Sequence, residues 1–253
     1  MVVVRKKDGS IRLCVDYRRL NEQTRKDAYP LPRIDEALDS LGGAKIFSSL
    51  DLAQGYHQVA IEEKDIHKTA FRAGTGGLYE YVRMPFGLSN SPATFQRLME
   101  AILGDLNYGS LLLYLDDILV FSDTFESHLE RLEVVFQRLR QHGLKVKPSQ
   151  CNLFRKECHY LGHVVSAEGI GTNPEKVAAI VSWQQPKSEK ELRAFLGLAG
   201  YYRRFVKGFS KLAAPLHALL TKQGCKKGAA WRNPPPTRGE NSRRGVNLTS
   251  QKQ

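Results

Sequence analysis

The sequence predicts an α+β fold in which a region of mixed strands and helices precedes a purely helical region. In the first 170 residues, short apolar runs alternate with turn residues, a pattern typical of strand hairpins, and amphipathic helical segments lie between them. From Asn173 onward the apolar residues recur only at helical spacing, and from about Gln223 that periodicity ends in a basic polar tail. We therefore expect three regions, residues 1–170, 171–222 and 223–253, of which the last is disordered.

The composition is that of a globular protein with a basic surplus. The chain has 253 residues, of which 42% are hydrophobic and 25% charged, and its formal net charge is +12. Residues 222–253 hold eight Lys or Arg and one Glu, so they account for most of that charge. The remaining surplus is compatible with a polyanionic partner such as nucleic acid, but it is weak support for one.

The cysteines and the apolar runs predict an intracellular protein, in the cytoplasm or the nucleus, without a membrane partner. Four cysteines lie without Cys-x-x-Cys spacing, which favours reduced thiols. A zinc site could be drawn from Cys151, Cys158, His159 and His163, but these pairs lack zinc-finger spacing. No run approaches the roughly 20 apolar residues of a membrane span, and the first residues lack the apolar core of a signal peptide.

The first elements are hairpins and short helices. The opening VVVRKKDGSIRLC indicates two strands around a Lys-Asp-Gly-Ser turn. A helix is expected from about Arg33 to Leu41, where Gly42 and Gly43 end it. The stretch KIFSSLDLAQGYHQ then indicates a strand that runs into a short helix, with Asp51 at the junction.

A second set of elements surrounds two adjacent aspartates. After a strand pair and a turn-rich loop, a helix is expected to begin near Ser91. The apolar runs from Leu111 to Leu115 and from Ile118 to Phe121 predict two buried strands, with Asp116 and Asp117 at the tip of their hairpin.

The remaining elements begin at recognisable helix caps. Asp123 and Glu126 predict a capping box for a helix that ends at Gly143. The apolar face of that helix is expected to consist of Leu129, Leu132, Phe136 and Leu139. After the strand-like HYLGHVVS, we place a boundary between subdomains near residues 169–171. Two further helices are expected to begin at Asn173 and at Ser188, the second with a capping box to Glu191.

Two adjacent carboxylates between apolar runs raise each other's pKa unless a cation pairs with them. The alternative is an exposed turn, since Asp is a common turn former. Asp51 favours the metal interpretation, because a sheet can bring the end of its strand beside the tip of the hairpin at Asp116 and Asp117. Three carboxylates can hold two Mg²⁺, with Mn²⁺ as an alternative ion, and such a site is suited to phosphoryl transfer.

Six motifs occur in the order found in reverse transcriptases, and together they resemble those of gypsy-like LTR retrotransposons. They are RKKDGSIRLCVDYRRLN, FSSLDLAQGYHQV, RMPFGLSNSPATFQ, LLLYLDDILVFS, HGLKVKPSQC and HYLGHVVSAEGI. The resemblance extends from Met1 to about Lys222. It implies a right-hand polymerase with an antiparallel-sheet palm, partial fingers and a helical thumb, within a chain that is a fragment of a Pol polyprotein.

The resemblance also implies roles for individual residues of the palm. Asp51, Asp116 and Asp117 correspond to the catalytic, metal-binding aspartates. The backbone carbonyl of Leu52 would complete the coordination of the metal. Tyr56 corresponds to an aromatic residue that blocks a ribose 2′-hydroxyl, and an ordinary core tyrosine is the alternative interpretation.

Other residues correspond to contacts with the nucleotide and the primer. Arg12 matches a finger arginine that contacts the incoming triphosphate, and Lys6 or Lys7 matches a lysine near its terminal phosphate. Further nucleotide-site residues are Phe86, Gly87 and, as a weaker match, Lys147. The primer grip corresponds to Tyr160, Leu161, Gly162 and His163. The alternative for the basic residues is a hairpin face in contact with solvent. The alternative for Phe86 and Gly87 is an ordinary packed loop, and that for the primer-grip segment is an edge strand.

The resemblance implies a nucleotidyltransferase, namely an RNA-directed DNA polymerase that adds deoxynucleotides to a primer 3′-hydroxyl by two-metal-ion catalysis. Its partners would be an RNA or DNA template, a primer and a dNTP. We expect incomplete fingers, and no ribonuclease H domain, since Glu240 is the only acidic residue beyond Thr221. One alternative is a noncatalytic nucleic-acid-binding remnant of such an enzyme. Another is a palm-type polymerase that copies DNA only.

Overall fold

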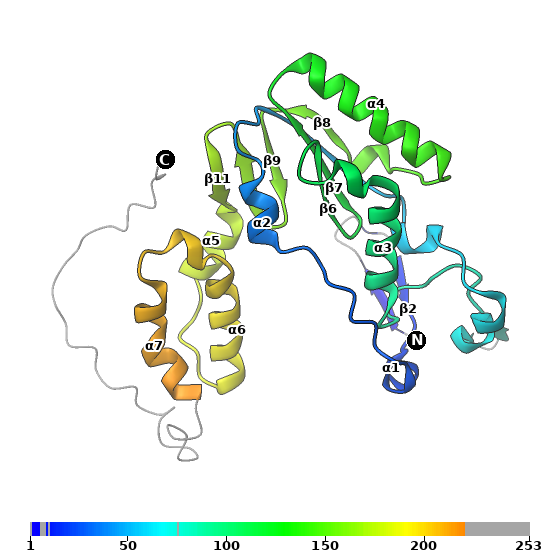
Figure 1. The fold of residues 1–253 in the computed structure, drawn as a ribbon. Coiled ribbons are helices and arrows are strands. Elements are labelled where there is room, and N and C mark those ends of the chain that lie inside the picture. The colour runs from blue at the N-terminus through cyan, green and yellow to red at the C-terminus, as the bar shows by residue number, and fades with distance from the viewer. Residues whose placement is uncertain (1, 6–8, 10, 75, 221–253) are drawn as a thin grey trace. The chain divides into compact units, whose positions relative to one another are not determined.

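The computed structural model describes residues 2–5, 9, 11–74 and 76–220 (Figure 1). These residues divide into two compact units. The first holds residues up to 161 together with 165–169, and the second holds 162–164 and the residues from 170 onward. No helix within the described ranges has the length and apolar character needed to cross a membrane.

A four-stranded sheet in the order β6-β7-β3-β8 forms the centre of the first unit. Its strands are β3 (Ile46–Asp51), β6 (Leu111–Tyr114), β7 (Asp117–Ser122) and β8 (Asn152–Arg155). β3 pairs antiparallel with both β7 and β8, and β6 pairs antiparallel with β7. Because the side chains of a strand alternate between faces, this register decides which residues of β3 and β7 lie together.

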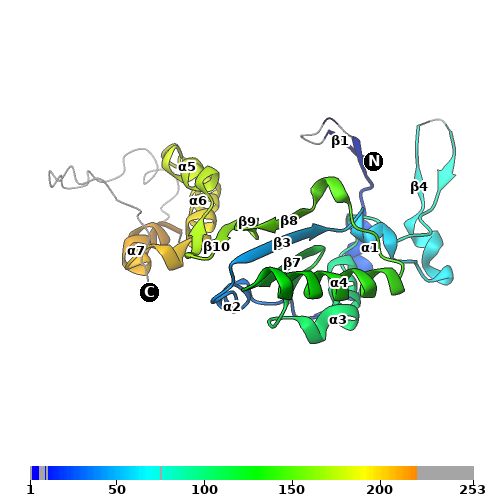
Figure 2. The same ribbon diagram turned by 90° about the horizontal axis from the view of Figure 1, so that it is seen from above.

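Two helices, α3 (Ser91–Leu103) and α4 (Phe125–Gln141), pack on one face of this sheet (Figure 2). The strands present Leu113, Ile118 and Val120 to that face, and all three are almost completely buried. Fully buried side chains of α3 and α4, among them Phe95 and Val135, complete the core. Burial of this apolar surface stabilises the layer that carries the aspartates.

The buried face of α4 differs from the expected one. Leu129, which was expected to be inside, is 47% exposed, whereas His128 is fully buried. Both ring nitrogens of His128 have hydroxyl partners, Ser48 and Ser122, and a buried imidazole needs such partners. The expectation was wrong because an apolar pattern cannot show that a polar residue will find its partners in the core.

The cap of α4 also differs from the expected capping box of Asp123 and Glu126. The N-cap is Thr124, whose side-chain oxygen accepts a hydrogen bond of 3.2 Å from the backbone N–H of Ser127. The hydroxyl of Thr124 therefore satisfies one of the free amides at the start of the helix. Gly143 has a φ of +68° just beyond the helix, in line with the predicted stop.

The tip of the β6–β7 hairpin is shifted by one residue from the expected one. Tyr114 pairs with Asp117, so the two-residue loop consists of Leu115 and Asp116. Asp117 is the first residue of β7, which corrects the expectation that both aspartates form the tip. The shift places Asp117 inside the sheet and opposite a residue of the neighbouring strand.

The other elements of the first unit are short. The opening hairpin and the expected helix before β3 are confirmed, and Gly43, with a φ of +81°, follows that helix. The strands are β1 (Val2–Arg5), β2 (Ile11–Cys14), β4 (Phe71–Arg72), β5 (Leu78–Tyr79) and β9 (Glu157–Tyr160). The helices are α1 (Arg18–Gln23), α2 (Ile34–Asp39), η1 (Gly55–Gln58), η2 (Glu63–Thr69), η3 (Gly104–Leu106) and η4 (Pro148–Gln150).

The chain passes from one unit to the other within a three-stranded sheet of order β11-β10-β9. β10 is His163–Ser166 and β11 is Gly169–Thr172. Beyond them lie α5 (Pro174–Val181), α6 (Glu189–Tyr201), η5 (Arg203–Phe205) and α7 (Phe209–Leu220). The predicted caps are confirmed, because Asn173 and Ser188 accept hydrogen bonds from the first turns of α5 and α6.

Candidate active site

The sheet brings the three candidate aspartates together. Asp51 is the last residue of β3 and lies directly opposite Asp117 in the antiparallel pairing with β7. Asp116 precedes Asp117 in the hairpin loop. Carboxylates that are remote in sequence are therefore neighbours at one end of the sheet, which is the placement that a shared ion would require.

The carboxyl group of Asp117 is affected by both of the other carboxylates. Burial of its carboxyl group, followed by repulsion from Asp116 and from Asp51, raises the pKa of Asp117 to about 6. Ionisation of Asp117 therefore costs free energy in the folded chain, and a bound cation would offset that cost.

Among the residues that the structure describes, no group of three or more His, Cys, Asp or Glu side chains could already hold a metal ion. The aspartates are therefore neighbours, but they do not form a ready-made cage. Their chemistry nevertheless fits Mg²⁺, which prefers hard oxygen ligands and usually takes several of them from water and from substrate phosphates. The mutual repulsion at Asp117 favours the binding of a cation.

Gly55 allows the helix η1 to approach the aspartate loop closely, and sequence analysis did not single it out. A Cβ atom at this position would lie 3.3 Å from Cβ of Asp116 and 3.2 Å from the ring of Phe95. Both distances are tighter than ordinary carbon contacts, so a larger residue would displace one of these neighbours. The signal in the sequence is a glycine only four residues after Asp51.

Tyr56 lies near Asp116 and packs against two other aromatic rings. Its ring centroid is 5.1 Å from that of Phe86 and 5.4 Å from that of Phe95. Burial, with a smaller contribution from Asp116, raises the pKa of the Tyr56 hydroxyl. Tyr56 and Phe86, two of the predicted nucleotide-site residues, are therefore in contact near Asp116.

Gly87 follows Phe86 in a conformation that favours glycine. Its φ is +97°, and its carbonyl accepts a hydrogen bond of 2.8 Å from the side chain of Asn21. A Cβ atom there would lie 3.5 Å from the ring of Tyr17 and from the carbonyl oxygen of Val15. Gly87 therefore lets the loop before α3 pack closely against the segment that follows β2.

Backbone pairing places Lys147 beside Asp51. The N–H of Lys147 donates to the carbonyl of Asp51 at 2.8 Å, and the buried residue Leu52 forms a bridge with Val146. The side chain of Gln58, which sequence analysis missed, makes hydrogen bonds on both sides of this junction. Its amide nitrogen donates to the carbonyls of Ala53 and Lys145, and its oxygen accepts from the N–H of Lys145.

The predicted triphosphate contacts lie in the opening hairpin. Arg12 is in β2, where it pairs with Val4 of β1, and the structure describes only its backbone. Lys6 and Lys7 lie outside the described residues. The roles of all three stay predictions.

The predicted primer-grip segment spans the junction between the units, so each side is described separately. In the first unit Tyr160 is buried, and its hydroxyl has no hydrogen-bond partner among the described residues. Burial, followed by repulsion from Asp117, raises the pKa of that hydroxyl. Leu161 and Gly162 form a turn in which both φ angles are positive, 45° and 73°.

On the side of the second unit, this segment packs against aromatic residues. The hydroxyl of Tyr202 donates to the carbonyl of Gly162 at 2.7 Å. His163 is buried, and its ring stacks on Tyr201 with centroids 5.2 Å apart. Since Tyr160 and His163 are both buried, only Leu161 and Gly162 are partly accessible in this stretch.

Comparison with known families supports one assignment. The family described as "Reverse transcriptase (RNA-dependent DNA polymerase)" matches residues 4–165. The chain is 47% identical over 226 residues to the retrovirus-related Pol polyprotein from transposon 297 of Drosophila melanogaster. It is 40% identical over 209 residues to that from transposon gypsy of the same organism. These matches cover 88% and 83% of the chain, but only 21% and 20% of the relatives.

Solved structures give the same result. A foamy viral protease-reverse transcriptase in complex with double-stranded DNA matches with a TM-score of 0.79 and 30% sequence identity. That match covers 88% of this chain and 40% of the viral one. The foamy viral protein in complex with an RNA/DNA hybrid matches with a TM-score of 0.74 and 31% identity, over 86% of this chain and 29% of that one. The architecture is therefore the α+β fold of viral reverse transcriptases.

Proposed function

The chain belongs to the reverse transcriptase family and corresponds to the reverse transcriptase domain of a retrotransposon Pol polyprotein; from this we propose that it copies RNA into DNA by extending a primer 3′-hydroxyl. One observation supports the catalytic part of this proposal. Asp51 lies opposite Asp117, which follows Asp116 in the chain; Asp117 is exposed, and the other two are half-buried. Three carboxylates so placed suit the handling of phosphate-bound metal ions.

Asp51, Asp116 and Asp117, with the carbonyl of Leu52, would hold two Mg²⁺ or Mn²⁺ ions. When bound, such ions favour ionisation of an attacking hydroxyl and stabilise charge on a leaving oxygen. The contribution of the chain itself is to fix the carboxylates on a rigid sheet. The pairing of β3 with β7 and the close approach of Gly55 to Asp116 both serve this purpose.

We assign the selection of deoxynucleotides to Tyr56. Its ring rests on Phe86 and Phe95 close to Asp116, so it can form one wall of the space in which the sugar of the nucleotide would lie. A rigid aromatic wall rejects a 2′-hydroxyl by steric exclusion. Phe86 and Gly87 shape the same pocket in this proposal.

Charged groups would bind the triphosphate. Arg12 and either Lys6 or Lys7 would contact its oxygens from the opening hairpin, because a guanidinium can bind two of them and an ammonium adds a mobile charge. Lys147, held beside Asp51 by its backbone, would supply a proton to the departing pyrophosphate. The turn at Leu161 and Gly162 would contact the primer strand.

The nucleic-acid partner is proposed from the solved relatives. The foamy viral proteins were solved with double-stranded DNA and with an RNA/DNA hybrid, which are the product and the intermediate of copying RNA. We propose that this chain binds the same kind of duplex, with a dNTP as its second substrate.

Primer extension tests the function directly. The purified chain, given a primed RNA template, Mg²⁺ and dNTPs, should lengthen the primer, and an Asp116→Asn variant should not. A parallel reaction on a DNA template separates RNA copying from a polymerase that copies only DNA. Equal behaviour of the wild type and the variant on RNA would contradict the proposal.

A nucleic-acid-binding protein that keeps this fold without polymerising is the second candidate. The observation that favours it is that the solved relatives are complexes with nucleic acid, and binding of a duplex does not require the aspartates to react. This candidate predicts tight binding of a primed template without extension, and no effect of Mg²⁺ on the melting temperature. Extension that depends on Asp116 would exclude it.

A further inference from the structure

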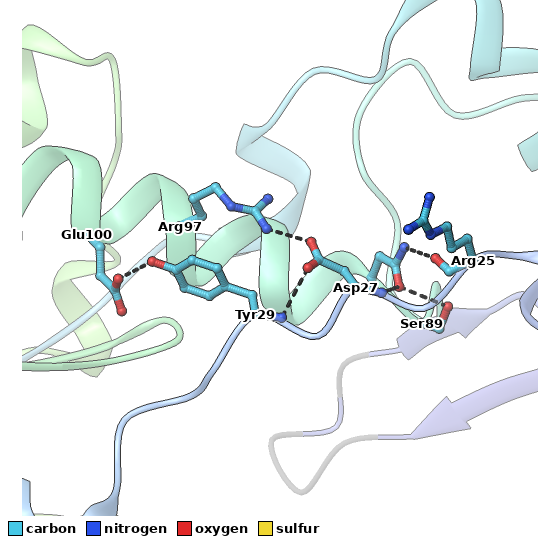
Figure 3. Close-up of polar contacts among 7 residues, drawn as sticks. Arg25, Asp27, Tyr29, Ser89, Arg97 and Glu100 are labelled. Atoms are coloured by element: carbon cyan, nitrogen blue, oxygen red, sulfur yellow. Dashed lines mark hydrogen bonds and ion pairs between the residues drawn. The ribbon is translucent and has the colours of Figure 1, made fainter.

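A chain of hydrogen bonds connects the loop that carries Asp116 to a distant segment of the same unit. The backbone N–H of Leu115 donates to Oε1 of Gln96 at 2.7 Å. Nε2 of Gln96 donates to Oε1 of Glu100, also at 2.7 Å, and the hydroxyl of Tyr29 donates to the other carboxylate oxygen of Glu100. Figure 3 shows the contact between Tyr29 and Glu100, at the outer end of this chain.

Leu115 is the residue in this loop that needs support. It is the first residue of a two-residue hairpin loop, and its φ is +56°. Glycine is the usual residue where a hairpin loop requires a positive φ, because a side chain there is strained. The loop before Asp116 therefore keeps its shape only if surrounding contacts hold it, and the acceptor that holds its N–H is Gln96.

Gln96 is well suited to hold the loop. It lies on α3, it is fully buried, and both ends of its side-chain amide are hydrogen-bonded. The direction of the amide follows from its partners, since a backbone N–H can only donate and a carboxylate accepts. A satisfied buried amide of this kind has one favourable orientation.

The outer end of the chain is also held firmly. The guanidinium of Arg97 lies 4.6 Å from the centre of the Tyr29 ring and makes an ion pair of 2.6 Å with Asp27 (Figure 3). Asp27 in turn accepts a hydrogen bond from the N–H of Tyr29, and its own N–H donates to the side chain of Asn90. The segment 25–29 is thereby fastened along the same helix that carries Gln96.

We propose that Gln96 is a positioning residue for Asp116 and Asp117, and that Tyr29 acts on these aspartates through Glu100 and Gln96. Docking of the segment 25–29 on α3 then determines how firmly the carboxylate loop is held. The catalytic consequence of this inference rests on the proposed polymerase function. The structural part, that Gln96 and Glu100 hold the loop at Leu115, does not depend on it.

Amide hydrogen exchange on the full chain tests the structural part. In a Gln96→Leu variant, which removes the side-chain amide but keeps a side chain of similar size, the amide of Leu115 should exchange about tenfold faster. Amides in the middle of β7 should be unaffected. The matched control is Gln137→Leu on α4, which removes an exposed glutamine that donates to Glu133 one turn earlier. Unchanged exchange at Leu115 in the Gln96 variant would overturn the inference.

Variants at the outer positions keep the test valid if the Gln96 variant does not fold. Glu100→Ala should speed exchange at Leu115, and Glu100→Gln should restore it, because a glutamine can still accept from Gln96. Tyr29→Phe keeps the ring beneath Arg97 but removes the hydroxyl, so a smaller increase is expected. Equal exchange in Glu100→Ala and the wild type would show that the outer contacts do not reach the loop.

Kinetics test the catalytic consequence. Gln96→Leu should lower kcat for primer extension at least about tenfold and raise the Mg²⁺ concentration needed for half-maximal rate, with KM for the primed template unchanged. If the wild type extends primers and this variant matches it, the inference is wrong while the proposed function stands. If the wild type shows no extension, the proposed function fails, and the exchange rates at Leu115 alone decide the inference.

Discussion

The hydroxyl of Ser48, on β3, lies 2.7 Å from Nε2 of His128, on α4. The other ring nitrogen of His128 lies 2.9 Å from the hydroxyl of Ser122, which itself donates to the carbonyl of Thr124. Burial lowers the pKa of this imidazole and so favours the neutral ring. Because the proton of Ser122 is engaged with Thr124, Nδ1 is then the donor and Nε2 the acceptor. The ring ties the helix to two strands of the sheet.

The first prediction concerns the pH dependence of stability at His128. Burial, and to a lesser extent Arg131, lowers the pKa of this imidazole below its ordinary 6.5. The unfolded chain then binds the proton more readily than the folded one, so the free energy of unfolding falls as the pH drops below about 6.5. Denaturant unfolding of the wild type should show this loss between pH 7.5 and 5.5.

A His128→Gln variant isolates that contribution. It should be about 1–3 kcal/mol less stable than the wild type at pH 7.5, because one or more hydroxyls lose a partner. The difference between the two proteins should shrink at pH 5.5. The control is His142→Gln at the exposed end of α4, and a constant difference across this pH range would refute the prediction.

The second prediction is that Asp117→Asn stabilises the metal-free fold while it abolishes extension. The pKa of Asp117 is about 6 in the folded chain against 3.8 ordinarily, so its ionisation weakens the fold as the pH rises between these values. Without Mg²⁺, the variant should melt at a higher temperature than the wild type above pH 6 and at the same temperature below about pH 4.

The corresponding change at Asp105 should shift the melting temperature in the opposite direction. Its ion pair with Arg138 lowers the pKa of this carboxyl, so Asp105→Asn should lower the melting temperature at pH 7.

Addition of Mg²⁺ should remove the higher melting temperature of Asp117→Asn relative to the wild type, since the ion relieves the repulsion in the wild type. A less stable Asp117→Asn variant at pH 7 without Mg²⁺ would show that the carboxylates do not repel one another.

The third prediction concerns sugar selection at Tyr56. Tyr56→Ala or Tyr56→Val should admit ribonucleotides, with the preference for dNTPs over rNTPs falling about tenfold or more, because the wall of the pocket recedes. Tyr56→Phe should keep the preference, since the ring remains. The comparison is the ratio of kcat/KM for the two sugars, with Tyr108→Ala at an exposed tyrosine as control. An unchanged ratio in Tyr56→Ala would indicate that the ring only packs.

The fourth prediction compares two glycine-to-alanine changes. Gly55→Ala should cost about 1–3 kcal/mol and reduce extension, because the new methyl group meets Phe95 and Asp116 at 3.2–3.3 Å. Gly197→Ala, within α6, meets no atom within 4 Å and should stabilise the chain by about 0.5–1 kcal/mol. Melting temperature and primer extension measure both. A Gly55→Ala variant as active as Gly197→Ala would refute the close approach at Asp116.

Local patterns were sufficient to predict most elements, and the ordered motifs singled out the three candidate aspartates. Two apolar runs indicated the β6–β7 hairpin, and the side-chain chemistry of Asn173 and Ser188 indicated where two helices begin. These features depend on interactions between residues a few positions apart, so they can be predicted from a short stretch of sequence.

The features that shape the candidate site required the folded chain. The register that sets Asp51 opposite Asp117, the burial of His128 and the support of Leu115 by Gln96 all join residues far apart in sequence. A local sequence pattern cannot identify such partners. A polar residue is predicted to be exposed unless its hydrogen-bond partner is known, and that partner is known only from the folded chain. Long-range packing therefore determines which residues surround each carboxylate, whereas the sequence alone was enough to identify the carboxylates as candidates.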